Sequence, residues 1–135
     1  MAPLVLDGGT GHELKCCLGQ AASGFYSAIR LNEDAPELVE GVHASFLAAG
    51  CSAVTTNNFV VTRAALARAG VERTRLGPLT AAAVARARDA VAASCASTRP
   101  LVLGALPPLG AECYDASLVP VSVEQLVEEY RELAA

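Results

Sequence analysis

Short apolar runs and longer amphipathic segments alternate along the chain. The apolar runs at residues 3–6, 51–56 and 100–106 predict three short buried strands. Apolar residues that recur every three or four positions predict helices between and after these strands. The predicted helices cover residues 13–18, 36–49, 64–69, 79–94 and the segment that follows Ser122. Strands that alternate with long crossovers indicate parallel pairing through right-handed βαβ units, which is an α/β fold.

The ends of two predicted helices carry capping signals. Asp34 is expected to cap the helix that starts near Pro36, and Gly50 to close it in a left-handed conformation. Ser122, with Gln125 three residues later, predicts a capping box for the last helix. On that helix Leu126, Val127 and Tyr130 are expected to face inward, and Glu128, Glu129, Arg131 and Glu132 to form a solvated face.

The first predicted strand ends in an acid that is followed by two glycines, Asp7-Gly8-Gly9. A carboxylate at the C-terminal end of a strand is typical of how barrel enzymes build a site. Paired glycines let the backbone approach a ligand closely, with amides free to donate. The alternative is a tight strand-to-helix turn that the aspartate caps.

Composition excludes several classes of protein. The 135 residues are 53% hydrophobic, which suits one globular domain with one core, and the net charge of 10 − 14 = −4 argues against nucleic-acid binding. The sequence contains no run of 18 apolar residues, so it predicts no membrane span. The N-terminus lacks the basic start of a secretory signal. Five cysteines without a C-x-x-C pair favour a reducing, cytoplasmic location and argue against a zinc site within the chain.

Several segments together resemble the homocysteine S-methyltransferase family. The resemblance runs in order over nearly the whole chain, and no single segment carries it. The matching segments are Leu6 to Leu14, Tyr26-Ser27-Ala28, Pro36 to Val39 with Val42-His43, Ala48-Ala49-Gly50, Val54 to Phe59, Ala64 to Gly70, and Gly104 to Gly110 with Tyr114.

The resemblance implies a (β/α)8 TIM barrel of which this chain holds about three βα units of eight. Such barrels need on the order of 250 residues. Residues 1–135 are therefore expected to be the N-terminal part of a homocysteine-binding barrel domain, truncated in its third helix. The alternative is a small self-sufficient α/β domain.

The activity implied by the resemblance is transfer of a methyl group to the thiol of homocysteine, which gives methionine. Donors in the family include S-methylmethionine and S-adenosylmethionine. A zinc ion held by three cysteines activates the thiol in the family, but the Asn-Cys and Gly-Gly-Cys-Cys segments that supply them do not occur here. Cys16-Cys17 lies on the first helix and does not replace them. The isolated chain is therefore expected to be inactive, and its open sheet to favour association.

Substrate-binding residues carry over by resemblance, whereas no catalytic or metal residue does. Asp7 is expected to accept from the homocysteine ammonium, and the Gly8 and Gly9 amides to face its carboxylate. Thr56 and Phe59 are expected to line the same pocket, with a neighbour-bonded threonine and a core phenylalanine as the alternatives.

Other residues depart from the family pattern or admit a structural role. His12 and Tyr26 stand where the family has a small residue or threonine and a tryptophan, and the pair Asn57-Asn58 favours a turn. His43 is expected to be structural or solvated on a helix outside the barrel. Two further readings stay open: a non-catalytic remnant or small-molecule-binding module, and a phosphate loop like that of the actin-like ATPases.

Overall fold

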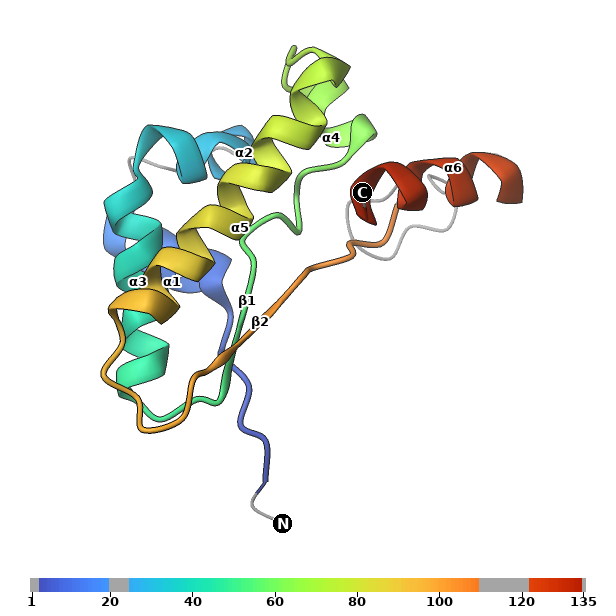
Figure 1. The fold of residues 1–135 in the computed structure, drawn as a ribbon. Helices are drawn as coiled ribbons and strands as arrows, with labels where there is room; N and C mark the ends of the chain where they lie inside the picture. The colour runs from blue at the N-terminus through green and yellow to red at the C-terminus, as the bar shows by residue number, and fades with distance from the viewer. Residues whose placement is uncertain (1–2, 20–24, 110–121, 135) are drawn as a thin grey trace.

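The computed structural model describes residues 3–19, 25–109 and 122–134, and these form a mixed α/β fold (Figure 1). The helices are α1 (Thr10–Leu18), α2 (Phe25–Asp34), α3 (Pro36–Ala48), α4 (Arg63–Arg68), α5 (Leu76–Ala93) and α6 (Val123–Ala134), with a 3-10 turn η2 (Arg73–Arg75) before α5. The strands are β1 (Ala53–Thr55) and β2 (Leu101–Leu103). No helix in these ranges is both long enough and apolar enough to cross a membrane.

The two strands pair in parallel, as the sequence predicts, although each is shorter than the predicted run. In the register of the pair, Val54 lies opposite Val102. The long α5 crossover supplies the connection that a parallel pair requires.

The first predicted strand runs beside β1 but forms only an isolated bridge, in which Leu6 pairs in parallel with Ala53. The Ser52 amide donates to the Val5 carbonyl at 2.7 Å, and the Asp7 amide donates to the Ala53 carbonyl at 3.1 Å. The spatial order is therefore first segment, β1, β2, and these contacts place Asp7 beside the end of β1.

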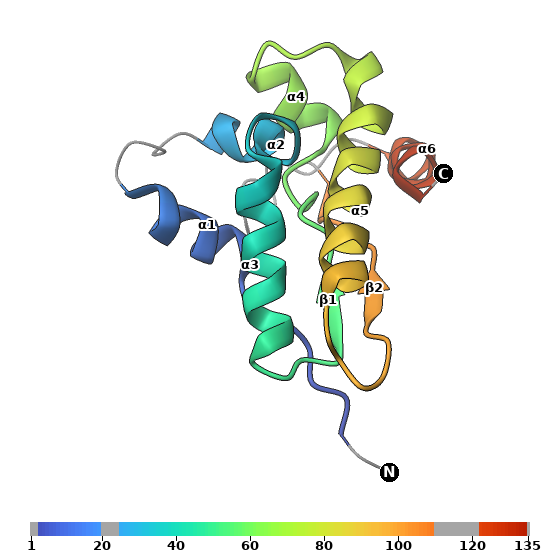
Figure 2. The ribbon, with the colours of Figure 1, turned by 60° about the vertical axis from the view of Figure 1, so that its left-hand side comes forward.

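Helices α3 and α5 lie side by side against one face of the strands (Figure 2). Val54 packs there with Ala87 and Val91 of α5, and Val102 joins the same cluster. A larger apolar cluster joins α2, α4, α5 and α6, and a third joins α1, α2 and α3. Most of the core therefore lies among the helices and between helices and sheet.

The first segment is not buried, which contradicts the predicted buried strand. Leu4 is 59% exposed, and Val5, Leu6 and Leu101 are also half exposed. The helices cover one face of the sheet, and no described element covers these side chains. The exposed apolar surface would favour the expected association of the chain, which stays a prediction.

Helices α1, α2, α3 and α5 differ from the predicted ones, and α5 begins three residues before the predicted Leu79. The residue that caps α3 is Ala35, not Asp34, because Asp34 still belongs to α2 and pairs there with Arg30. Pro36 takes the first helical position, and Gly50 has φ +96°, both as predicted. The sequence analysis missed α2 altogether and started α1 three residues late.

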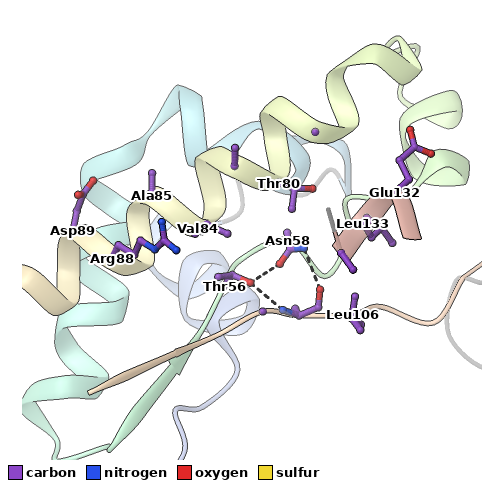
Figure 3. Close-up of a pocket in the computed structure, with 15 residues that line it drawn as sticks. Thr56, Asn58, Thr80, Val84, Ala85, Arg88, Asp89, Leu106, Glu132 and Leu133 are labelled. Carbon is purple, nitrogen blue, oxygen red and sulfur yellow. Dashed lines mark hydrogen bonds between the residues drawn. The ribbon is translucent and has the colours of Figure 1, made fainter. Parts of the chain in front are cut away.

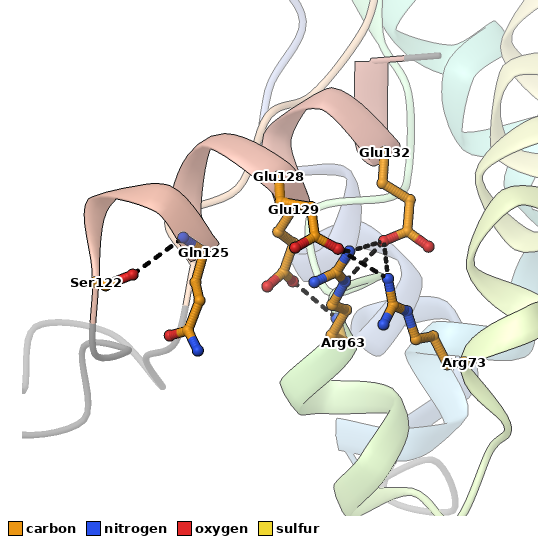
Figure 4. A network of polar contacts seen from close by, with 7 residues as sticks. All are labelled: Arg63, Arg73, Ser122, Gln125, Glu128, Glu129 and Glu132. Carbon is orange, nitrogen blue, oxygen red and sulfur yellow. Dashed lines mark hydrogen bonds and ion pairs between the residues drawn. The ribbon is translucent and has the colours of Figure 1, made fainter.

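The last helix begins as predicted, because the Gln125 amide donates to the Ser122 hydroxyl at 3.2 Å. Glu128 and Arg131 are exposed as predicted, but Glu129 does not belong to the solvated face (Figure 4). Val127, which was expected to face inward, is 42% exposed. Glu129 is buried and accepts from the Arg63 amide at 3.0 Å, at the start of α4. An acid that caps another helix in this way joins α6 to α4.

The side chain of Arg63 is held by two more acids of α6. Arg63 Nε donates to Glu132 at 2.7 Å and Nη2 to Glu128 at 3.0 Å, and Arg73 contacts both acids. Hydrogen bonds from Arg63 lower the pKa of each carboxyl. Desolvation alone would lower the pKa of the Arg63 guanidinium, but its bonds to Glu132 and Glu128 outweigh that effect and raise it.

His43 is fully buried on α3, so of the two expectations the structural one holds. Neither ring nitrogen has a hydrogen-bond partner among the described residues. Burial lowers the pKa of His43, and the nearby Asp7 carboxylate opposes that shift. The imidazole is therefore held neutral inside the fold.

We expect Arg63→Met to loosen α6, because the variant keeps the apolar stem but removes the donors that hold Glu128 and Glu132. Amide hydrogen exchange in α6 should become about three- to tenfold faster, the scale of a partly exposed ion-pair network. Arg131→Met removes an exposed cation of the same helix and serves as the control. Equal exchange in the two variants would contradict the role given to Arg63.

We expect the free energy of unfolding to decrease as the pH falls below about 6.5, the ordinary histidine pKa. Below that pH the unfolded chain binds a proton that the folded chain excludes from His43, whereas above it both states are neutral. His43→Leu should flatten this part of the stability curve in urea titrations from pH 5 to 8. His12→Leu, which removes the exposed histidine, should keep the slope; a slope unchanged in His43→Leu would refute the assignment.

Candidate functional site

A shallow pocket of about 430 Å³ lies where the first segment and β1 end and α1 begins. All five predicted binding residues line it. The lining residues are Leu6, Asp7, Gly8, Gly9, Thr10, Gly11, Thr55, Thr56, Asn57, Phe59, Val60 and Ala105. Residues from three separate segments therefore meet here, as expected at the C-terminal ends of parallel strands.

Asp7 is half-buried, and its carboxylate is held by a single residue of β1. The Thr55 amide donates to Oδ2 at 2.7 Å, and the Thr55 hydroxyl donates to Oδ1 at 2.8 Å. The carboxylate does not cap α1, because the residue before that helix is Gly9 and no side chain bonds its first amides. The turn-capping alternative for Asp7 is therefore wrong.

The start of α1 leaves backbone donors available beside Asp7. The amides of Gly8, Gly9 and Gly11 have no acceptor among the described residues, whereas the Thr10 amide donates to the Gly8 carbonyl at 3.0 Å. Unpaired amides at a helix N-terminus attract anionic groups. The pocket thus places a carboxylate next to a cluster of amide donors.

The two glycines are not equivalent. A Cβ built on Gly8 would lie 2.8 Å from Cε1 of Phe46, whereas one on Gly9 would lie 3.5 Å from the Cβ of His12, an ordinary contact. Phe46 belongs to α3, which packs beneath the turn. Gly8 is therefore needed for the close approach of the turn to α3, and Gly9 is not.

Thr56 is buried, and its hydroxyl is already used within the protein (Figure 3). The hydroxyl donates to Oδ1 of Asn58 at 2.6 Å and accepts from the Ala105 amide at 3.0 Å. The Asn58 amide group donates to the Ala105 carbonyl at 3.1 Å. These bonds tie the end of β1 to the end of β2, so Thr56 contributes a wall to the pocket.

Asn57 and Phe59 complete this side of the pocket. The buried Asn32 side chain donates to the Asn57 backbone carbonyl at 2.8 Å. The side-chain amide of Asn57 donates in turn to Oδ1 of Asn32 at 3.3 Å. Asn58 begins a turn, as predicted, because its carbonyl accepts from the Val61 amide at 2.9 Å, and the bonds of Asn57 anchor this segment to α2. Phe59 is 54% exposed at the pocket edge, so the alternative of a core position is wrong.

A second, larger cavity of about 920 Å³ lies between α5 and α6 (Figure 3). Thr56 and Ala105 separate it from the first pocket, because both line both spaces. Its walls are mostly apolar, with Arg88 and Asp89 among the charged lining residues. None of the other predicted site residues reaches it.

The described residues offer no metal cluster. Burial raises the pKa of the Cys51 thiol, and the Asp7 charge adds to that effect while backbone hydrogen bonds oppose it. Cys16 is exposed and lies 3.7 Å from Nε2 of His12, away from the pocket lining. No group of three or more His, Cys, Asp or Glu side chains in the described ranges could hold a metal ion.

Among the pocket residues that were not predicted, Thr55 is the one that bonds the Asp7 carboxylate. The motif drew attention to Thr56, one position later, but alternation along a strand turns neighbouring side chains to opposite faces. The signal was available: if Asp7 ends one strand and Thr55 ends its parallel neighbour, their side chains can share a face.

The sequence model of the family described as homocysteine S-methyltransferase matches residues 4–135. The chain belongs to the homocysteine S-methyltransferase family. This confirms the resemblance found in the sequence. No curated protein matches the chain.

Solved structures of one enzyme are similar to this member of the family. The metallated form of the homocysteine methyltransferase MmuM from Escherichia coli has a TM-score of 0.81 and 25% sequence identity, over 98% of this chain and 49% of that chain. The oxidized form has a TM-score of 0.77 and 26% identity, over 98% and 50%. The chain thus spans about half the length of the solved enzyme.

We expect Gly8→Ala to destabilise the protein, because the added methyl overlaps the Phe46 ring. Overpacking of this kind costs about 1–3 kcal/mol in the free energy of unfolding. Gly9→Ala is the matched control, one residue away, and should change stability less. Urea denaturation of both variants makes the comparison, and a Gly8→Ala variant at least as stable as Gly9→Ala would disprove the steric argument.

Proposed function

We propose that this chain binds homocysteine through its amino-acid end and belongs to a protein that transfers a methyl group to the homocysteine thiol, which yields methionine. The observation that carries the proposal is the convergence of Asp7, Gly8, Gly9, Thr56 and Phe59 on one pocket. Family membership supplies the substrate class.

The electrostatics of the pocket suit a free amino acid. The Asp7 carboxylate is a natural acceptor for an ammonium group. The free amides at the start of α1 suit the carboxylate of the same ligand. A zwitterion can satisfy both ends at once, with its side chain lying along the walls formed by Thr56 and Phe59.

We infer that the fold is the N-terminal part of a (β/α)8 barrel domain, with about three βα units over residues 1–135. The support is the parallel order of first segment, β1 and β2, each followed by helix, and the similarity to half of a solved homocysteine methyltransferase. In such barrels, ligands bind at the C-terminal ends of the strands. The pocket occupies that position.

The residues described here do not fit a zinc centre, because they contain no candidate ligand cluster. No step of the reaction is therefore assigned to zinc on this chain. We propose that its own residues bind and orient the substrate, and that the isolated chain is inactive in methyl transfer. The donor we propose is a sulfonium compound such as S-methylmethionine or S-adenosylmethionine, and the location is the cytoplasm.

A non-catalytic small-molecule-binding module is the second candidate. The feature that favours it is that the amino-acid pocket is formed in a chain without metal ligands in its described part. Homocysteine binding without turnover is expected under both proposals, so binding is the first property to test.

We expect L-homocysteine to bind in calorimetric titrations under reducing conditions, and Asp7→Asn to weaken that binding about 10- to 100-fold. The loss reflects replacement of a charged hydrogen bond to the ammonium group. Asp34→Asn removes an exposed carboxylate of α2 that lies outside the pocket, and it should bind like the parent. Absence of heat with the parent protein, or equal binding by the Asp7 variant, would argue against the proposed pocket.

A further inference from the structure

Thr55 holds the Asp7 carboxylate from a different segment of the chain, 48 residues away. Its backbone amide and its hydroxyl each bond one oxygen, at 2.7 and 2.8 Å. The amide bond is as short as a charge-assisted hydrogen bond, and the hydroxyl bond has the usual O–H···O length. Nothing else in the described chain donates to this carboxylate.

We propose that Thr55 is a positioning residue, which fixes the Asp7 carboxylate in the orientation that receives the ammonium group of the substrate. This inference rests on the proposed function, because it concerns the same pocket. The role belongs to the hydroxyl, since every residue except proline would keep the backbone amide donor at position 55.

Carboxylate chemistry explains why two bonds from Thr55 leave Asp7 competent to bind. An ionised carboxylate offers about four lone-pair sites on its two oxygens. Thr55 occupies one site on each oxygen, so further sites stay available for a ligand donor. The carboxylate carries no hydrogen, so the threonine hydroxyl must be the donor in this bond.

Orientation matters because the terminal torsion of an aspartate is broad. The χ2 angle has no sharp wells, so a free carboxylate rotates and must be ordered when a ligand binds. Thr55 removes that freedom beforehand, and its own χ1 angle is restricted by the branched Cβ. Preorganisation of this kind strengthens binding without an added contact to the ligand.

The test compares L-homocysteine with 4-mercaptobutanoate, which is the same molecule without the amino group. Thr55→Val keeps the shape of the side chain but removes the hydroxyl donor. We expect it to weaken L-homocysteine binding about tenfold, the scale of one hydrogen bond to a charged group, and to change 4-mercaptobutanoate binding less than about twofold. Thr55→Ser restores the hydroxyl and should bind L-homocysteine within about threefold of the parent.

The matched control is Thr80→Val, which removes a threonine hydroxyl on α5. This hydroxyl has no hydrogen-bond partner within the described part of the chain, and Thr80 lines the other cavity. It should bind both ligands like the parent. If Thr55→Val fails to fold, Thr55→Ala removes the same hydroxyl and must show the same selective loss.

The outcomes separate this inference from the proposed function. A parent protein that binds neither ligand would overturn the proposed function and the positioning role with it. A parent that binds L-homocysteine, with a Thr55→Val variant that binds it equally well, would overturn the positioning role alone. Equal weakening of both ligands would show a merely structural threonine and would overturn the role as well.

Discussion

The parallel hydrogen bonds between the first segment and β1 are the interaction on which the pocket depends. They set Leu6 opposite Ala53 and so carry Asp7 to the end of β1, where Thr55 can reach both carboxylate oxygens. A slip of one residue would turn the side chains of the segment to the other face. The apolar side chains of the segment are exposed, so the few backbone bonds to Ser52 and Ala53 fix this register.

Buried polar side chains near the first segment and β1 differ in whether they have hydrogen-bond partners. The end of β1 is tied to β2 through Thr56, Asn58 and the backbone of Ala105, and each of these side chains finds partners. His43, which lies close enough for the charge on Asp7 to oppose its pKa shift, finds none. The bonded set stabilises the wall of the pocket, whereas the bare imidazole costs stability once the pH allows the unfolded chain to protonate.

Local signals in the sequence predicted much of the fold, and contacts distant in sequence account for most of what it missed. The spacing of apolar residues located α3, α5 and α6. The predictions that Gly50 ends α3 and that Ser122 precedes α6 were correct because capping depends on residues close in sequence. Asp34 failed as a cap because α2, a helix that was not predicted, extends through it. Glu129 failed as a member of the solvated face of α6 because its partner, the Arg63 amide, lies 66 residues away in the sequence. The family motif located the pocket, but the partner of Asp7 depends on strand register.

Opposite potentials placed side by side account for the ligand selectivity that we propose for the pocket. Asp7 provides negative charge on the β1 side, and the uncapped start of α1 provides donors a few residues later in the same turn. A simple amine would leave the amides unpaired, and a simple carboxylic acid would face Asp7 without a cation, so each loses part of the interaction. An α-amino acid carries both charges on neighbouring atoms, which matches the short distance along the chain between Asp7 and Gly9. The selectivity therefore follows from one strand end and one helix start, and it depends on a carboxylate that Thr55 keeps in place.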